Sequence, residues 1–207
     1  MTTDTSMQKA LNAFIAGDGV FEGLGLERLH SLYVWPKRGE FPDLDDLQFH
    51  GTNYEKNIRL KKVFADLWCD GDRVMLAHWI INRWGGIRRN SDDTIRGYVS
   101  RIEQEDFPSE LSGVASYSKI LAFIQPEKFA IYDARVAASL NGIQLLFGVD
   151  KGSIWNNLQG RNKKIEEFKK TIAGSKAFER RGWRKLDKHK CYTFYNNELK
   201  SALSNFP

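Results

Sequence analysis

Apolar residues recur every three or four positions along most of the chain, which is the period of an amphipathic helix rather than of a strand. The clearest repeat follows Ser91 and Asp92, either of which would cap a helix, and its inward positions are Ile95, Tyr98, Val99 and Ile102. Further helices are predicted over residues 7–15, 56–69 and 73–84 and from beyond Asp133 to about Leu146, and an aromatic C-terminal element is expected over 192–203. We therefore expect a mainly α-helical fold.

Two of these helices, 56–69 and 73–84, are separated only by a short turn. Gly71 in that turn suits a helix C-terminus, and Asp72 suits the N-cap of the next helix. Seven apolar residues of the pair are expected to face inward: Val63, Phe64, Trp68, Met75, Leu76, Trp79 and Ile80. Ahead of them, from about Gly23 to Tyr54, the sequence is loop-rich and includes Pro36, Pro42 and a cluster of aspartates.

Composition places the chain among globular proteins. It has 207 residues, of which 42% are hydrophobic and 28% charged, with a mean hydropathy of -0.48. No linker rich in Pro, Gly or Ser divides it. We expect one compact unit over 1–207 built from two lobes that share a cleft: a helical lobe over 56–125, and a second lobe formed by 1–55 and 126–207.

The cysteines and the N-terminal sequence bear on metal binding, disulfide bonding and cellular location. Cys69 and Cys191 stand apart from each other and from any Cys or His cluster, which argues against a zinc site, an iron–sulfur cluster or a disulfide framework. We accordingly expect no metal and no cofactor. The chain has neither a basic leader nor an apolar run of the ~20 residues that a membrane span needs. The expectation is a cytoplasmic protein with no membrane partner and no obligate protein partner.

The net charge of +5 comes from one segment of the chain. Residues 161–190 contain 12 basic and 4 acidic residues, so this segment carries +8. Such a segment could follow a phosphate backbone. Alternatively, Ile165, Phe168 and Ile172 recur at helical spacing with lysines between them, which is the pattern of a helix docked by one apolar stripe with a solvated basic face.

The residues from Asp106 to Leu140 carry the strongest functional pattern. Pro108 suits the first position of a short helix, and a small-residue turn over 111–115 leads into a second helix that must end before Pro126. The sequence thus predicts two helices joined by a glycine hairpin. Backbone N–H groups around Gly113 to Ser116 would then lie at a helix N-terminus, where a phosphate can bind, and a side chain at Gly113 would obstruct that approach.

These residues resemble the helix-hairpin-helix DNA glycosylases, and among them the small prokaryotic proteins with the 8-oxoguanine DNA glycosylase fold. The family pattern is an L-P-G-V-G hairpin, a helix, and then V-D-x-H/R-V with an essential aspartate. Leu111, Gly113 and Val114 match the hairpin. The later run is matched by Ile131, Asp133 and Val136, and Asp133 follows Gly113 by 20 residues. The stretch from Ser118 to Leu121 and Pro126 add to the likeness, which covers about 35 residues in all.

The resemblance implies a two-lobed helical fold and a DNA glycosylase that flips a damaged or modified base of double-stranded DNA into a cleft. Asp133 would stabilise the sugar cation and activate water or Lys119. An 8-oxoguanine substrate is carried by the resemblance alone. Three aromatic residues are expected to form the base pocket: Tyr117, Tyr132 and Trp84. The expected DNA-binding residues are Gly113, Val114, Ala115, Ser116, Ser118, Arg88 and Arg135, and the basic segment 161–190 would add to the grip on DNA.

The chain departs from the family pattern at three positions. Ser112 replaces the hairpin proline, and Ala115 replaces the second glycine. Tyr117 stands where lyase-active members carry a catalytic lysine, which implies a monofunctional glycosylase. Lys119 lies two residues further on, about 200° around an ideal helix, and would be the amine nucleophile only in a different register.

Each of these residues also has an ordinary structural interpretation. Asp133 is placed as a helix N-cap, Tyr117 and Tyr132 as core residues, and Lys119 as a surface lysine. The run Trp84 to Asn90 is either a glycine loop presenting arginines to DNA or a helix C-terminus followed by exposed charge. Two further interpretations of the whole chain stay open: a non-enzymatic DNA-binding module that keeps the hairpin, and a helical protein with a fortuitous glycine turn.

Overall fold

The computed structural model describes residues 6–34, 50–160 and 162–206, and this part of the chain is mainly helical, as the periodicity predicts. Strand is confined, within the described residues, to a parallel pairing of β1 (Ser153–Ile154) with β2 (Arg184–Lys185). The chain divides into two compact units. The middle unit comprises Arg28–Pro108 and Gly113–Ile131, and the terminal unit comprises Met1–Glu27, Ser109–Ser112 and Tyr132–Pro207.

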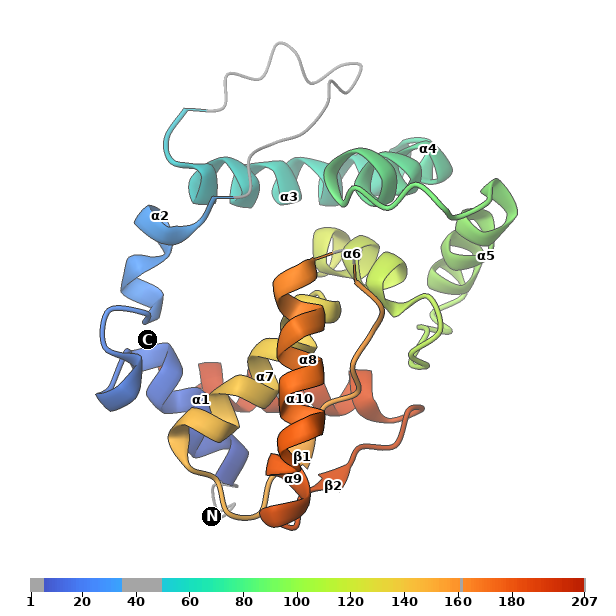
Figure 1. The fold of residues 1–207 in the computed structure, drawn as a ribbon. Helices are drawn as coiled ribbons and strands as arrows, with labels where there is room; N and C mark the ends of the chain where they lie inside the picture. Colours follow the sequence, from blue (N-terminus) through green and yellow to red (C-terminus); the bar gives the residue numbers. More distant parts are fainter. Residues whose placement is uncertain (1–5, 35–49, 161, 207) are drawn as a thin grey trace. The chain divides into compact units, whose positions relative to one another are not determined.

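The middle unit is an assembly of helices that follow one another along the chain (Figure 1). Its elements are α2 (Leu29–Leu32), α3 (Asn53–Asp70), α4 (Arg73–His78), a π-helical turn η3 (Trp79–Trp84), α5 (Asp92–Glu103) and α6 (Val114–Ile124). Thr52 and Glu55 form a reciprocal capping box at the start of α3. Asp72 caps α4 and Ser91 caps α5, as the sequence predicts.

Aromatic side chains fill the core of the middle unit. Phe64 of α3 packs edge-on against Phe123 of α6 and tilted against Trp79 of η3, with ring centroids 5.5 and 4.7 Å apart. Leu60, Leu76, Ile80 and Trp84 complete this cluster. The unit begins before the predicted lobe of 56–125 because α2 packs on α3, and it continues past it because Ile131 packs on the same core.

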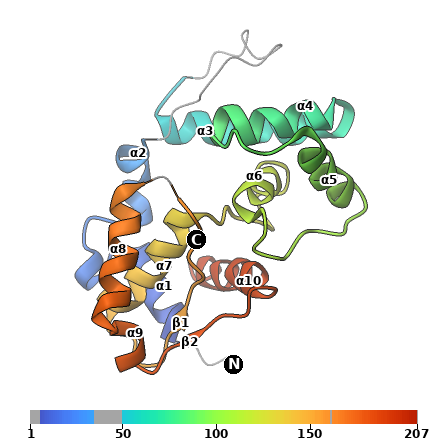
Figure 2. The same cartoon turned by 45° about the vertical axis from the view of Figure 1, so that its right-hand side comes forward.

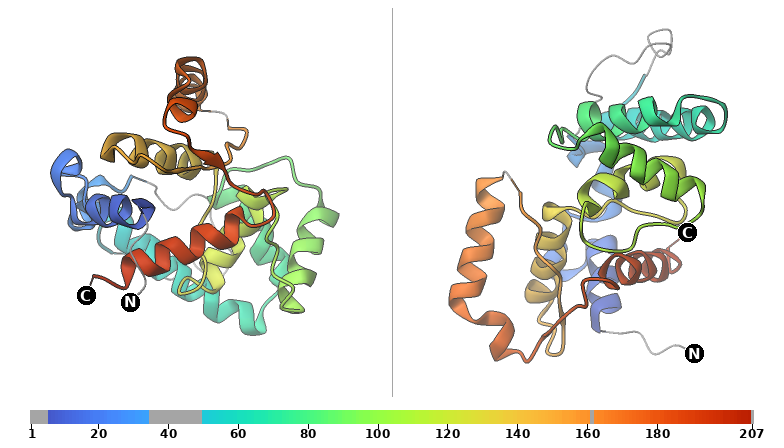
Figure 3. Two further views of the ribbon diagram at one scale, coloured as in Figure 1. Left: turned by 90° about the horizontal axis from the view of Figure 1, so that it is seen from below. Right: turned by 90° about the vertical axis from the view of Figure 1, so that its right-hand side faces the viewer.

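The terminal unit is built around α7. Its elements are α1 (Ser6–Ala16), the 3₁₀ turn η1 (Gly19–Phe21), α7 (Ala134–Phe147), β1, α8 (Lys163–Ser175), α9 (Ala177–Arg180), β2 and α10 (Cys191–Leu203). Helix α1 contacts both α7 and α10, and α8 lies along α7 (Figures 2 and 3). Another 3₁₀ turn, η2, spans Leu26–Arg28.

Side-chain amides attach the segment that follows α7 to that helix. Asn141 donates to the carbonyl of Trp155 and accepts from its N–H, at 3.1 and 2.9 Å. Gln144, one turn later, does the same for Ser153, at 2.9 and 3.0 Å. Each amide therefore satisfies both polar groups of a backbone residue, much as a neighbouring strand would.

Three details differ from the sequence-based expectation. Met75 is 43% exposed rather than buried, because the buried side of α4 is formed by Leu76 and Ala77. No helix begins at Pro108: the backbone from Glu105 to Gly113 is irregular, so the first helix before the glycine is α5. Finally, α2 and η2 lie in the region expected to be loops, while Pro36, Pro42 and the neighbouring aspartates lie outside the described residues.

Candidate functional site

Asp133 begins α7 as its N-cap. Its backbone is extended, with φ -139° and ψ -174°, and its Oδ1 accepts hydrogen bonds from the N–H groups of Arg135 and Val136, at 2.8 and 3.1 Å. The residue is partly exposed. The N-cap interpretation is therefore correct, and it leaves an oriented carboxylate at a helix terminus that favours negative charge.

A group of tyrosines lies beside this aspartate. The ring of Tyr195 on α10 lies 5.3 Å from that of Tyr132, the residue that precedes Asp133. Burial raises the pKa of Tyr195, and the charges of Tyr192 and Asp133 raise it further. The phenol next to the carboxylate is therefore a neutral hydrogen-bonding group at ordinary pH. The sequence identified an aromatic C-terminal element but contained no signal that would place it beside Asp133.

Tyr132 is a core residue. It is completely buried, its hydroxyl donates to the carbonyl of Asn156 at 3.2 Å, and the thiol of Cys191 donates to it at 3.3 Å. Burial together with these neighbours raises the pKa of Tyr132. Its ring is covered on all sides, so the predicted role in stacking on a base does not fit this arrangement.

Gly113 caps α6 in the left-handed conformation, with φ +71°. A Cβ at this position would lie 1.9 Å from the hydroxyl oxygen of Tyr98 on α5. Packing against α5 therefore requires glycine here, whether or not a ligand binds. The Gly113 carbonyl accepts from the N–H groups of Ser116 and Tyr117, at 2.8 and 3.1 Å. The N–H groups that can bind an anion are therefore those of the first turn, Val114 and Ala115.

The side chains predicted to contact DNA along α6 face inward. Val114, Ser116 and Ser118 are buried, and Ser116 Oγ accepts a hydrogen bond of 2.8 Å from Asn90. Ala115 is half-buried. A hydrophobic helix such as α6, packed on α3 and η3, leaves little of its surface for a ligand. Gly113 and the backbone of the first turn are therefore the parts of this element left open to a ligand.

Lys119 is neither a surface lysine nor an exposed nucleophile. The side chain is 5% exposed, and its Nζ donates to the carbonyl of Ala115 at 2.6 Å. The aliphatic part runs past Gly85, where a Cβ would lie 2.7 Å from Lys119 Cδ. Gly85 therefore makes room for a buried lysine, a relation that the sequence did not suggest.

Tyr117 and Trp84, the other predicted pocket aromatics, also belong to the core. Tyr117 is completely buried, with its ring 5.8 Å from that of Tyr98. Trp84 packs edge-on against Phe123, and its Nε1 donates to Asn57 Oδ1 at 2.7 Å. The core interpretation of Tyr117 is therefore correct, and Trp84, for which no core role was expected, is a core residue as well.

Arg88 and Arg135 are the predicted DNA-binding side chains that reach solvent. Arg88 follows Gly85, which ends η3, and Gly86, which has φ +67°. This is the arrangement of a helix terminus followed by exposed charge. Arg135 is exposed in the first turn of α7. Asp133, Tyr132 and Arg135 belong to the terminal unit, whereas Gly113 to Lys119, Trp84 and Arg88 belong to the middle unit.

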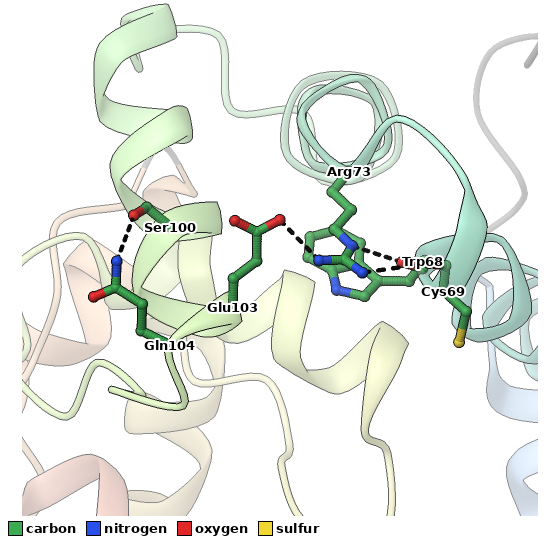
Figure 4. Close-up of polar contacts among 6 residues, drawn as sticks. All are labelled: Trp68, Cys69, Arg73, Ser100, Glu103 and Gln104. Carbon is green, nitrogen blue, oxygen red and sulfur yellow. Dashed lines mark hydrogen bonds and ion pairs between the residues drawn. The ribbon is translucent and has the colours of Figure 1, made fainter.

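An open hollow of about 430 Å³ lies in the middle unit between the α3–α4 turn and α5. Arg73 crosses it, donating to the carbonyls of Trp68 and Cys69 and to Glu103 Oε1, the last at 2.9 Å (Figure 4). The guanidinium thus satisfies C-terminal carbonyls of α3 and links them to α5. These hydrogen bonds give Arg73 a structural role: it clamps the end of α3 to α5 beside the hollow.

The described residues contain neither a group of metal ligands nor a helix suited to cross a membrane. No three His, Cys, Asp or Glu side chains gather there as metal ligands. None of the helices in the described ranges has both the length and the apolar character of a bilayer span. Comparison of the chain with family models, curated proteins and solved structures finds no significant match.

Proposed function

We propose that the chain is a DNA glycosylase that removes a damaged or modified base from double-stranded DNA, with Asp133 as the catalytic carboxylate and a helix-hairpin-helix-like, two-lobed fold. The observation that carries the proposal is the placement of Asp133. It is a partly exposed carboxylate, fixed by two backbone donors at the start of α7, 20 residues after Gly113, the glycine that caps α6.

The chemistry requires a carboxylate in such a position. Breaking the N-glycosidic bond develops positive charge on the deoxyribose, and a fixed negative group nearby lowers the energy of that transition state. The Arg135 and Val136 N–H groups hold Oδ1, so the carboxylate does not have to reorganise as charge develops. The bond between C1′ and the base nitrogen breaks, and the base departs with the electron pair. Water adds to C1′ through its oxygen, and the proton that it loses neutralises the departing base.

Water is the nucleophile in this proposal. Lys119 is buried and bonded to the Ala115 carbonyl, and a nucleophilic role would first require it to leave that partner. Hydrolysis by water leaves an abasic site without strand cleavage and without a covalent intermediate. Borohydride treatment should therefore trap no protein–DNA adduct, while an adduct lost in Lys119→Ala would assign the attack to that lysine.

A screen for base release tests the proposal directly. Duplexes carrying one oxidised, alkylated, deaminated or hypermodified base are incubated with the protein, and free base is measured by mass spectrometry. We expect release of at least one class of modified base, and 8-oxoguanine is one of the candidates. Absence of release from every duplex, under conditions where the protein binds them, would reject an enzymatic role.

A non-enzymatic DNA-binding module is the second candidate. The observation that favours it is the burial of Tyr117, Tyr132 and Trp84, because a glycosylase must offer an aromatic or apolar surface to the flipped base. This module would bind duplexes with and without lesions equally and would release no base. A preference for a lesion-containing duplex over an identical undamaged duplex would favour the enzyme.

A further inference from the structure

The rotation of α8 about its axis is set by an apolar stripe. Ile165, Phe168 and Ile172 are half-buried, and Phe168 lies against Gly142 of α7, where a Cβ would be 3.9 Å from the ring. At 100° per residue, Lys163 and Lys170 fall on the opposite side of α8 from this stripe. Both lysines are exposed, as that geometry requires.

Most basic side chains of residues 162–190 have no ion-pair partner within the described residues. Lys169 is the exception: it donates to Glu166 Oε1 at 2.6 Å and to the Leu158 carbonyl, and this lowers the pKa of Glu166. Between residues 162 and 190, nine basic side chains are exposed against three acidic ones. No other ion pair joins the described residues of this range, so the surface keeps a large positive excess.

The continuation of this surface over α9 and β2 is anchored to the terminal unit. Trp183 is buried, its Nε1 donates to the Val149 carbonyl at 3.0 Å, and its ring stacks on Phe178 at 5.0 Å. The following residues, Arg184 and Lys185, pair with β1 and remain exposed. The two-residue sheet therefore holds these cations on a fixed backbone rather than on a loose loop.

We propose that the basic surface of α8, α9 and β2 binds the phosphate backbone of undamaged double-stranded DNA without regard to sequence and separately from base removal. The proposal takes its partner class from the proposed function and adds a second mode of binding to it. This basic surface consists of the exposed lysines and arginines of residues 162–190.

Electrostatics favour a polyanion as the partner of the basic surface. Like charges on neighbouring turns repel one another, and a phosphate backbone relieves this repulsion while releasing its condensed counterions. Lysine and arginine contacts of this type carry no base readout, because phosphates are the same at every step. Their expected role is to retain the protein on long DNA and let it slide to a lesion.

A charge-removal variant tests the proposal. In Lys163→Ala/Lys164→Ala/Lys170→Ala, the affinity for an undamaged duplex of about 30 base pairs should fall about tenfold or more near 100 mM salt. The slope of log affinity against log salt should become less steep by about two to three. Alanine favours helix at these exposed positions, so α8 should remain folded, as circular dichroism would check.

The matched control removes three exposed basic residues from the middle unit, Arg59→Ala/Lys62→Ala/Lys128→Ala. This variant has the same net charge as the first, and its affinity and salt slope should stay close to those of the parent. Equal loss in the two variants would attribute binding to overall charge and overturn the assignment to α8, α9 and β2. Unchanged affinity in the α8 variant, or tighter binding of duplex RNA or single strands than of duplex DNA, would overturn it as well.

Base release separates this inference from the proposed function. If the parent releases no base but shows the predicted salt slopes, the proposed enzyme is rejected and the basic surface stands. If base release is found and the salt slopes do not differ, the basic surface is rejected and the enzyme stands.

Discussion

Gly113 illustrates how one position can be explained in two ways. The sequence indicates a glycine because a phosphate must approach the helix N-terminus. In the structure, the same glycine has φ +71° and faces the hydroxyl of Tyr98 at a distance that no Cβ tolerates. Packing of α5 on the start of α6 is thus sufficient to require glycine, with or without DNA.

Replacing Gly113 should therefore destabilise the protein through Tyr98. Gly113→Ala adds a left-handed non-glycine residue and an overlap with the Tyr98 hydroxyl, for a loss of about 2–4 kcal/mol in the free energy of unfolding. Tyr98→Phe removes the closest atom, so the double variant should lose less than the sum of the single losses. Urea denaturation of all four proteins measures this coupling, and additive losses would show that the Tyr98 hydroxyl is not what opposes a side chain at Gly113.

Local sequence predicted the structural role of some key residues but not which residues surround them in the fold. Asp133 as an N-cap follows from a short polar residue ahead of an apolar repeat, and the structure confirms it. Lys119 was expected at the surface and is buried, because the space beside Gly85 that accommodates it is formed by a distant part of the chain. Burial of a lysine cannot be inferred from the residues that flank it.

At the scale of elements, α7 shows how a helix whose buried face includes polar side chains is held in place. Asp133 caps its start, and Gly148 ends it with φ +80°. Between them, Asn141 and Gln144 bond the backbone of Trp155 and Ser153. Helix, turn and β1 are thereby fixed to one another by polar contacts rather than by apolar packing alone.

The Asn141 amide should consequently be important for stability. Asn141→Leu has a similar volume but leaves the buried N–H and carbonyl of Trp155 without their partner, which should lower the free energy of unfolding by about 2–4 kcal/mol. Ser139→Ala, at an exposed position of α7, serves as the control and should change stability by less than about 0.5 kcal/mol. A loss for Asn141→Leu no larger than that of the control would contradict the assigned role.

Helix periodicity predicted most elements because their buried faces recur at fixed spacing, as in α5. It failed at Pro108, where a residue suited to start a helix is followed by too few apolar positions to stabilise one. The pairing of β1 with β2 could not be predicted either. Each strand has two residues, which is too few to show an alternating pattern, and the two strands lie far apart in the chain.

At the scale of the whole molecule, buried phenols make stability depend on pH. Burial is the main cause that raises the pKa values of Tyr132, Tyr192 and Tyr195 in the terminal unit. Burial also raises the pKa of Tyr33 in the middle unit, to about 12. Each phenol is therefore neutral in the folded protein at pH values where the unfolded chain already loses its proton.

The free energy of unfolding should fall as pH rises above about 10. In that range the unfolded state binds fewer protons than the folded state, so each buried phenol contributes a decline of about 1.4 kcal/mol per pH unit until its folded pKa is reached. Tyr132→Phe should reduce the slope by the share of one phenol. Chemical denaturation between pH 9 and 11 gives the slopes, and phenolate absorbance should appear together with unfolding. Phenolate formation by all tyrosines ahead of unfolding would contradict the burial argument.

The mainly helical fold was predictable from the sequence, whereas the arrangement around the candidate acid was not. Tyr195 lies beside the Tyr132–Asp133 pair through the packing of α10, and no local pattern links these positions. Three aromatics chosen as pocket residues are core residues instead. An aromatic next to a key residue in the sequence is as well suited to filling a core as to binding a base.

The most direct measurement is single-turnover base release by Asp133→Asn, together with its affinity for the same lesion-containing duplex. Asparagine remains a good N-cap, so α7 and the protein fold should be preserved while the negative charge is lost. The account predicts that the rate of base release falls at least about a hundredfold and that affinity changes by no more than about twofold. Release at the parental rate by a folded Asp133→Asn protein would contradict it.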